Sequence, residues 1–237
     1  RLDRRETLLV DANADLIACY DAIRNWPEEV IETLRGFAER HRKEGEAFYY
    51  EIRDGRFNPA RLSGAPPTPQ LAAMFIYLNR TGFNGLYRLN RDGGFNVPMG
   101  RYAEPKICDP NHLRAVSATL RRPGITLRHG SYAQAIAQAG AGDFVYCDPP
   151  YAPLSPTASF AHYTAGGFSA DDQAALRDAV VQAAGRGAAV LLSNSSAPLI
   201  RRLYSSPAAK AAGISIRRVP ARRAINARAT KIGRAHV

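Results

Sequence analysis

The second half of the sequence alternates short apolar runs with segments of helical periodicity, and this alternation restricts the folds open to the chain. Each apolar run is bounded by polar or turn residues, as a short buried strand is. Parallel strands need a crossover between them, and a helix is the usual crossover. The alternation therefore predicts an α/β fold with a mostly parallel sheet. The expected strands are ITLRHG (125–130), DFVYC (143–147), AAVLLSN (188–194) and ISIRRVPA (214–221); the expected helices are YAQAIAQA (132–139) and 169–185, with Ser169 as N-cap, Asp172 in a capping box and Gly185 as the stop.

The first half shows a different pattern. Residues 56–70 are rich in Pro, Gly and Ser and predict a loop, whereas 81–102 have the glycine-rich composition of a hairpin with Asp92-Gly93 as its turn. We therefore expect one sheet domain built from 1–26 and 107–237, interrupted by an inserted, mainly helical domain over 27–106 that carries this β-hairpin. The other expected elements are a strand at LLV (8–10) and helices over 14–26, from Pro27 to near Gly45, over 71–80 and over 111–119.

The chain carries a large excess of positive charge. Its 237 residues have a net charge of +11 and a pI of about 9.9, which favours a polyanionic partner, although charge alone fits a generally basic protein equally well. No apolar run approaches the roughly 20 residues that cross a bilayer, so we expect no membrane partner. Neither the five histidines nor Cys19, Cys108 and Cys147 have metal-ligand spacing, which predicts a cytoplasmic protein with reduced thiols and no metal site.

The apolar run at 144–147 ends in Asp148, Pro149, Pro150 and Tyr151. Ligands of open α/β sheets bind beyond the carboxyl ends of the strands. Two prolines fix the backbone and bring no N–H donor, so a rigid carbonyl lies beside a fixed carboxylate. Together these groups accept two hydrogen bonds from an amino group, and the flat phenol can stack on the ring that carries it. The motif therefore predicts a pocket for an exocyclic NH₂ on a planar ring, with a proline-rich turn as the alternative.

Asp11 ends the first predicted strand in the same way. A carboxylate at that position commonly accepts hydrogen bonds from the ribose hydroxyls of a nucleoside cofactor. It can instead serve as the N-cap of the helix that follows, unless Asn13 or Asp15 takes that role.

These residues resemble the Dam-type, or D12 class, DNA adenine-N6 methyltransferases, whose motif IV reads D-P-P-Y. The likeness extends from about Leu8 to Lys231 and keeps the family's order of segments. It is carried by VDANADL (10–16), FIYLNRTGFNGLYRLNRDGGFNVPMGRY (75–102), DPPYAPLSPTASFAHY (148–163) and RRAINARA (222–229). The resemblance implies a Rossmann-like sheet that binds S-adenosylmethionine, with 27–106 as the target-recognition domain. The expected protein is a monomer that acts on double-stranded DNA.

The resemblance also implies roles for individual residues. Asp11, Ser131, Tyr132 and Asp148 would line the cofactor site. Asp148 and the carbonyl of Pro149 would accept hydrogen bonds from N6 of a flipped adenine, Pro150 would rigidify the turn, and Tyr151 would stack on the base.

The target sequence implied by the resemblance is GATC, read by the hairpin. Arg88 would read a guanine, Leu86 and Pro98 would contact a thymine methyl group, and Phe83 and Asn84 would enter the space left by the extruded adenine. Arg91 and Arg101 are phosphate candidates, and Phe83 is alternatively a core aromatic. The full set of expected DNA-binding residues is Phe83, Asn84, Leu86, Arg88, Asn90, Asn96, Pro98 and Arg101.

Two family segments, a glycine-rich F-x-G-x-G loop and W-x-G-G-K, do not occur in these residues, so we expect an N-terminally truncated chain. The closing IGRAHV (232–237) matches a translated sequencing adapter, and we expect no function of it. Two alternatives to an active DNA methyltransferase stay open. One is a catalytically inactive DNA-binding remnant, and the other is a methyltransferase for an RNA or protein amide, although such enzymes typically carry N-P-P-Y.

Overall fold

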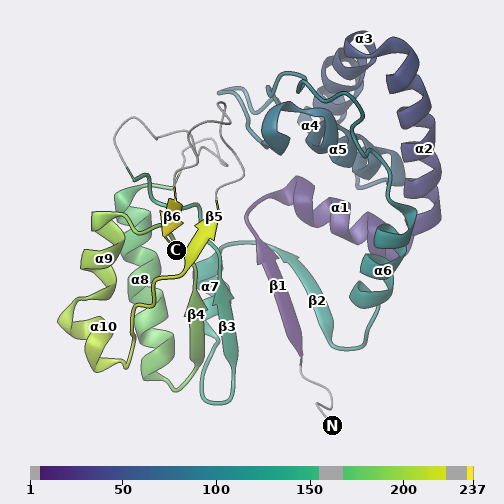
Figure 1. Cartoon of the computed structure of the whole chain (residues 1–237). Helices are drawn as coiled ribbons and strands as arrows, with labels where there is room; N and C mark the ends of the chain where they lie inside the picture. The colour runs from purple at the N-terminus through teal and green to yellow at the C-terminus, as the bar shows by residue number, and fades with distance from the viewer. Residues whose placement is uncertain (1–5, 155–167, 223–233, 237) are drawn as a thin grey trace. The chain divides into compact units, whose positions relative to one another are not determined.

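The computed structural model describes residues 6–154, 168–222 and 234–236 of the chain (Figure 1). The contacts divide it into two compact units, 1–131 and 132–237. Most of RRAINARA, the stretch from Ser155 to Tyr163, and part of IGRAHV lie outside the described residues.

The first unit contains a parallel pair of strands. β1 (Thr7–Asp11) pairs with β2 (Ile125–His129), with Leu9 opposite Leu127 and Asp11 opposite His129. Both strands were predicted, and β1 ends at Asp11 as expected. Asp11 therefore lies at the carboxyl end of a parallel strand, where α/β proteins bind their ligands.

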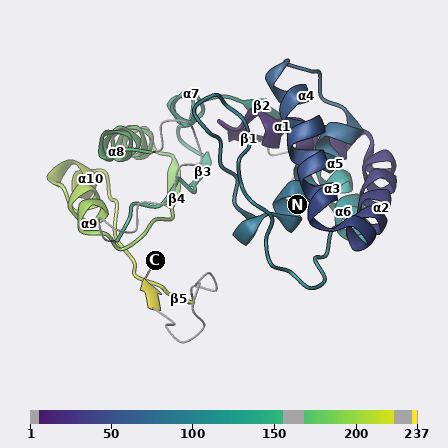
Figure 2. The same cartoon turned by 90° about the horizontal axis from the view of Figure 1, so that it is seen from above.

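Helices make up most of the rest of this unit. α5 packs against α1, α2 and the π-helical turn η1 (Figures 1 and 2). α2 begins at Pro27, whose missing N–H costs nothing in the first turn, and stops at Gly45, which adopts a φ of 54°. The elements are α1 (Ala14–Asn25), α2 (Pro27–Glu44), α3 (Glu46–Tyr50), η1 (Glu51–Phe57), α4 (Asn58–Leu62), α5 (Pro69–Thr81), the 3-10 turn η2 (Phe83–Gly85) and α6 (Pro110–Leu120).

The predicted loop over 56–70 is wrong in part, because η1 and α4 continue the helical path to Leu62. Phe57 explains the difference. It is 1% exposed and its ring lies 6.0 Å from that of Phe95 and 6.4 Å from that of Phe75. Burial of one aromatic ring outweighs the local composition, which describes only the backbone preference.

An aromatic cluster forms the centre of this unit. Tyr77 on α5 is fully buried, and its ring contacts Phe37, Phe48 and Tyr49. Its hydroxyl lies 2.9 Å from Nδ1 of His41. The Tyr49 hydroxyl donates to the carbonyl of Val97 at 2.9 Å, so the cluster also holds the segment that leaves the hairpin.

The hairpin is a loop with two isolated bridges, Leu89 opposite Phe95 and Gly82 opposite Met99, and has no regular strands. The amide of Gly93 donates to the carbonyl of Asn90 at 3.1 Å. Gly93 has a φ of 81°, which an L side chain would resist. The turn predicted at Asp92-Gly93 is thus confirmed.

The second unit contains another parallel pair, in which β3 (Phe144–Cys147) lies beside β4 (Ala189–Leu192) with Cys147 opposite Leu192. α8 packs against β4, α7 and α9. Ser169 and Asp172 form the predicted capping box of α8. The remaining elements are α7 (Tyr132–Ala137), α8 (Ala170–Gly185), α9 (Pro198–Tyr204), α10 (Pro207–Ala211) and the antiparallel pair β5 (Pro220–Arg222) and β6 (Arg234–His236).

The strand predicted over 214–221 is wrong for most of its length, because regular pairing begins only at Pro220. Ile216 and Val219 are 47% and 49% exposed. An alternating apolar pattern stabilises a strand only where other residues cover its apolar side chains, and these two side chains are not covered.

The described strands form three two-stranded sheets, two of them parallel. This agrees with the mixed α/β class, while one continuous Rossmann-like sheet and the division into 1–26, 27–106 and 107–237 stay predictions. No helix among the described residues combines the length and the hydropathy needed to span a bilayer.

Leu34, on the buried face of α2, is 0% exposed. We expect Leu34→Ala to lower the free energy of unfolding by about 2–5 kcal/mol, because it removes buried apolar contacts and leaves a cavity. Urea denaturation measures the change. Glu32→Ala, on the exposed face of the same helix, is the control and should stay within about 0.5 kcal/mol of the parent. Equal midpoints for the two variants would contradict the assigned core.

Candidate active site

The predicted motif at the end of β3 is held by the end of the neighbouring strand. Because β3 and β4 are parallel and in register, Asp148 and Ser193 follow them at the same edge. The amide of Ser193 donates to the carbonyl of Cys147 at 3.0 Å, and its hydroxyl donates to Oδ1 of Asp148 at 2.6 Å. No described residue hydrogen-bonds Oδ2 of Asp148. The carboxylate is therefore oriented through one oxygen, and the Asp148 side chain is exposed.

Beyond Asp148, the two prolines differ in how their carbonyls are used. The carbonyl of Pro150 accepts a hydrogen bond from Nε2 of Gln173 at 2.8 Å. No described residue donates to the carbonyl of Pro149. Tyr151 follows with 37% of its surface exposed, so its ring is available to a planar partner. The predicted set from Asp148 to Tyr151 thus presents a carboxylate oxygen, a carbonyl and an aromatic ring together.

The side chains that hold this motif in place were not among the residues predicted from the sequence. They are Gln173 on α8 and the run Ser193, Asn194 and Ser195 that follows β4. Asn194 Oδ1 accepts from the amide of Ala152 at 3.0 Å, next to Tyr151. The signal was present, because AAVLLSN is an apolar run that ends in polar residues, the same pattern that singled out Asp11 and Asp148.

Asp11 does not cap α1. Asn13 is the N-cap, and its Oδ1 accepts from the amides of Asp15 and Leu16 at 3.0 and 3.3 Å. Oδ1 of Asp11 accepts from the amide of Asn13 at 2.7 Å. This bond orients the carboxylate at the carboxyl end of β1.

Ser131 and Tyr132, the other predicted cofactor residues, lie at the boundary between the two units. Tyr132 begins α7, and its ring centroid lies 6.0 Å from that of Phe168. Burial raises the pKa of its hydroxyl. The roles of Asp11, Ser131 and Tyr132 stay predictions.

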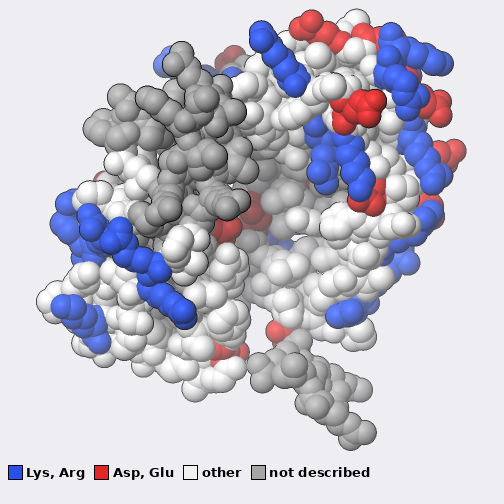
Figure 3. Space-filling view, viewed as in Figure 1, with Lys and Arg blue, Asp and Glu red and all other residues white. Residues whose placement is uncertain are grey.

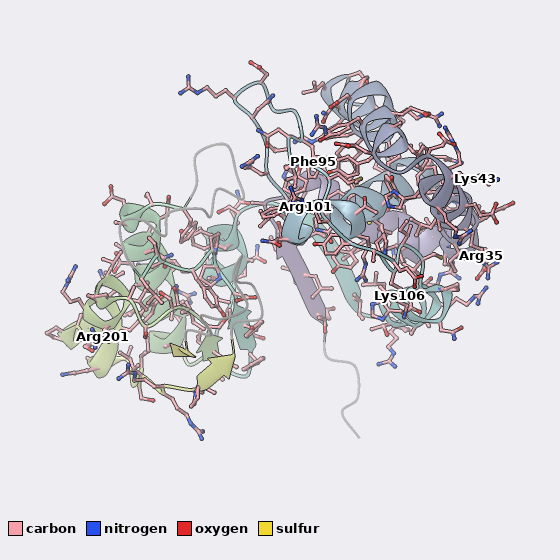
Figure 4. The ribbon with its side chains drawn as sticks, turned by 45° about the horizontal axis from the view of Figure 1, so that its top comes forward. Arg35, Lys43, Phe95, Arg101, Lys106 and Arg201 are labelled. Atoms are coloured by element: carbon pink, nitrogen blue, oxygen red, sulfur yellow. The ribbon has the colours of Figure 1, made fainter. Side chains whose placement is uncertain are left out.

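The hairpin presents most of the predicted DNA-binding residues at its surface. Phe83 is 44% exposed, which removes the alternative of a core aromatic, and Asn84 has a left-handed φ of 54°. Arg88 is pre-oriented, since its Nε donates to Oδ1 of Asn96 at 2.8 Å. The other exposed members are Asn90, Pro98 and Arg101, and the half-buried members are Leu86 and Asn96. Figure 4 labels Arg101 in the segment that leaves the hairpin.

Asn90 has an internal structural contact. Its Oδ1 accepts from the amide of Gly94 at 2.8 Å and closes the turn. A role in the fold of the hairpin is therefore observed for Asn90, and its contact with DNA stays a prediction.

A polar cluster fastens the hairpin to α1, and we call Asp15, Arg61 and Tyr87 the hairpin anchor. Oδ2 of Asp15 accepts hydrogen bonds from Nε of Arg61 and from the hydroxyl of Tyr87, and Nη1 of Arg61 donates to the carbonyl of Gly93. The side chains of Arg61 and Asp15 are only 19% and 16% exposed. Burial raises the pKa of Tyr87, so its hydroxyl remains a donor. The turn of the hairpin is thereby held to the helix that begins just after Asp11.

On the face drawn in Figure 3, lysine and arginine side chains lie on both units, and on the helices of the first unit acids lie among them. Together with the net charge of +11, this surface favours association with a polyanion.

Residues 3–225 match the family model of the D12 class N6 adenine-specific DNA methyltransferases. The chain belongs to this family. It is 41% identical over 204 residues to the Type II methyltransferase M1.LlaDCHI of Lactococcus lactis subsp. cremoris, covering 84% of this chain and 69% of that protein. It is 37% identical over 235 residues to the Type II methyltransferase M.MjaIII of Methanocaldococcus jannaschii, covering 96% and 76%. The DNA adenine methylase of Vibrio cholerae is 42% identical over 205 residues, covering 85% and 70%.

As a D12 class methyltransferase, the chain belongs to enzymes that use S-adenosylmethionine as cofactor. Its residues offer features that fit this molecule. Asp11, predicted to accept from ribose hydroxyls, has a fixed carboxylate at a strand end, and Tyr132, predicted to lie near the adenine, has a partly buried aromatic ring. When bound, S-adenosylmethionine supplies a methyl group bonded to a sulfonium sulfur, and the methyl carbon is the electrophile.

The hairpin anchor generates a testable expectation. Tyr87→Phe removes one hydroxyl that donates to a partly buried carboxylate, so we expect the free energy of unfolding to fall by about 1.5–3 kcal/mol. We also expect faster hydrogen exchange at the amide of Gly94, measured by NMR. Tyr50→Phe is the matched control, because no described residue hydrogen-bonds its hydroxyl. A Tyr87→Phe protein as stable as the control would contradict the anchor.

Proposed function

We propose that this chain transfers a methyl group from S-adenosylmethionine to N6 of a flipped adenine in double-stranded DNA, within the sequence GATC. The observation that carries the proposal is the arrangement at the end of β3. In a chain of this family, Oδ2 of Asp148 and the carbonyl of Pro149 are left without described partners beside the exposed ring of Tyr151.

The chemistry of an adenine amino group explains why these acceptors matter. The lone pair of N6 is delocalised into the ring, so the nitrogen is a poor nucleophile. Acceptors for both N6 hydrogens favour a tetrahedral nitrogen and expose its lone pair. Asp148 also stabilises the positive charge that develops on N6 during attack, and this interaction is stronger in the transition state than in the ground state. Stacking on Tyr151 holds the ring in line for transfer.

An adenine inside a duplex cannot reach this motif, so the base must leave the helix at a cost of a few kcal/mol. We propose that Phe83 and Asn84 enter the space it leaves. Both side chains are exposed. Asn84 has a left-handed backbone, so the chain turns sharply at this residue before it reaches Leu86.

We propose that Arg88 reads the guanine of the site. Asn96 holds the guanidinium through Nε, which donates to its Oδ1, and through Nη2, which donates to its carbonyl at 3.2 Å. The hydrogens of Nη1 and the second hydrogen of Nη2 remain for guanine O6 and N7. Leu86 and Pro98 supply apolar surface for a thymine methyl group, whereas Arg91 and Arg101 contact phosphates.

At the level of the fold, we propose that the two parallel pairs belong to one Rossmann-like sheet and that 27–106 forms the target-recognition domain. Several apolar strand residues are more than a third exposed: Leu8 and Leu9 of β1, and Phe144 and Tyr146 of β3. Parallel sheets are normally covered on both faces, so this exposure supports a larger, covered sheet. We also propose that the chain acts as a cytoplasmic monomer, as the sequence predicts.

A catalytically inactive DNA-binding remnant is the competing proposal. It predicts that the protein binds a GATC duplex and transfers no methyl group, so the assays below separate the two. A methyltransferase for RNA or a protein amide is disfavoured by Asp148, since the sequence carries Asp where such enzymes typically carry Asn, and by the names of the relatives. The Type II methyltransferases among them suggest a place in restriction and modification.

Site specificity can be measured with short duplexes and methyl-labelled S-adenosylmethionine. We expect transfer to a GATC duplex and none to a GTTC duplex. Arg88→Met should lower kcat/KM on GATC by about 5- to 150-fold, because a bidentate contact to guanine is worth about 1–3 kcal/mol. Arg91→Met is the matched control on the same hairpin and should weaken binding to all duplexes alike. Equal turnover on GATC and scrambled duplexes would overturn the assignment of Arg88 and Pro98.

The assigned role of Asp148 predicts that Asp148→Ala lowers kcat by at least about 100- to 1,000-fold, as loss of a group aimed at transition-state charge does. Binding of the GATC duplex, measured by fluorescence anisotropy, should survive. Asp171→Ala is the control, since Asp171 is an exposed carboxylate in the same unit. Turnover retained in Asp148→Ala would refute the role.

A further inference from the structure

Three polar side chains are buried beneath the loop that follows β3. Gln173 is 1% exposed, and Asn194 and Ser195 are each 6% exposed. Gln173 comes from the first turn of α8, whereas Asn194 and Ser195 follow β4. Burying an amide costs free energy unless all of its hydrogen-bonding groups are satisfied, so such a group is retained for its contacts.

These side chains form a continuous chain of hydrogen bonds to the backbone on both sides of Tyr151. Gln173 Nε2 donates to the carbonyl of Pro150 at 2.8 Å, and Asn194 Nδ2 donates to Gln173 Oε1 at 3.0 Å. Asn194 Oδ1 in turn accepts from the amides of Ala152 at 3.0 Å and Ser195 at 2.8 Å. The hydroxyl of Ser195 donates to the carbonyl of Ala152 at 2.5 Å.

The backbone partners fix the orientation of both amides. A proline carbonyl only accepts, so Gln173 must present its NH₂ group to Pro150. A backbone amide only donates, so Asn194 must present its oxygen to Ala152. The groups that remain, Gln173 Oε1 and Asn194 Nδ2, are then complementary, and the network has one consistent direction.

We propose that Gln173 and Asn194 are positioning residues for the methyl transfer. The Pro149-Pro150 pair contains two carbonyls and no N–H, so neither residue can donate a backbone hydrogen bond. Gln173 occupies the carbonyl of Pro150 and leaves that of Pro149 as the acceptor for N6. Asn194 holds the amide of Ala152, so that Tyr151 is fixed from both sides. This inference rests on the proposed function and assigns to Gln173 the choice of which carbonyl faces the substrate.

Gln173→Met keeps the volume of the side chain and removes both hydrogen-bonding groups. We expect kcat on a GATC duplex to fall by about 10- to 100-fold, because small misplacement of reacting groups has effects of that size. KM for DNA and the Kd of S-adenosylmethionine should change by less than about twofold. Gln182→Met, at an exposed position of α8, is the matched control and should behave as the parent. Parental kcat in a folded Gln173→Met protein would overturn the proposal.

Gln173→Glu gives a second readout that a purely structural role would not produce. A protonated Glu donates its O–H to the carbonyl of Pro150 and accepts from Asn194 with its other oxygen, whereas an ionised Glu cannot donate. Burial favours the protonated form. Activity relative to the parent should therefore rise as pH falls and be lost as pH rises through the pKa of the introduced carboxyl. A ratio independent of pH would contradict the proposal, and this test remains if Gln173→Met fails to fold.

Hydrogen exchange at the amide of Ala152, measured without DNA or cofactor, separates this inference from the proposed function. Loss of protection in Gln173→Met, with protection kept in Gln182→Met, would support the positioning role of Gln173 even in protein that transfers no methyl group. Unchanged protection would overturn it. Absence of methyl transfer in the parent protein would count against the proposed function. The exchange result would then still decide whether Gln173 and Asn194 hold the loop around Tyr151.

Discussion

The parallel pairing of β3 with β4 is the constraint on which the candidate active site depends. Because Cys147 lies opposite Leu192, the residues that follow the two strands emerge at one edge, and Ser193 reaches Asp148. A shift of register by one residue would turn each side chain of β4 to the other face. The same pairing brings Asn194 to the amide of Ala152. One backbone ladder therefore orients the carboxylate and supports the loop that follows it.

In the first unit, side-chain hydrogen bonds hold the hairpin in place, whereas a backbone ladder supports the loop after β3. The hairpin has only isolated bridges, and such a loop has little stability of its own. The Tyr49 hydroxyl holds the carbonyl of Val97 on one side, and Arg61 holds the carbonyl of Gly93 at the turn. Asp15, which accepts hydrogen bonds from Arg61 and Tyr87, lies in the first turn of α1. The surface that we propose for base reading is thus fixed to a helix whose start is set by the Asp11–Asn13 turn.

Local signals in the sequence predicted what local physics decides. Four such features depend on neighbouring residues, and the structure agrees with each: the end of β1 at Asp11, the end of β3 just before Asp148, the capping box of Ser169 and Asp172, and the turn at Asp92-Gly93. Helix α4 and the unpaired stretch 214–219 were missed because burial of Phe57 and exposure of Ile216 depend on distant partners. Gln173 was missed for the same reason, since nothing in its helix marks it as the partner of Pro150. Asp148 to Tyr151 were predictable as a motif, but their support was not.

Ion pairing decides which cations remain available to DNA. On the helices of the first unit, Arg40 pairs with Glu44 and Glu51, and Arg114 pairs with Glu28. No described acid pairs with Arg88, Arg91 or Arg101. Exposed ion pairs contribute little to stability, but each removes one positive charge from the field that attracts a polyanion. Arg88, Arg91 and Arg101 therefore keep their positive charges available to a polyanion. Arg88 differs from Arg91 and Arg101 because Asn96 restrains its guanidinium, and restraint lowers the entropy lost in a directional contact. On this argument Arg88 is suited to discriminate a base, and the other two are suited to bind any phosphate.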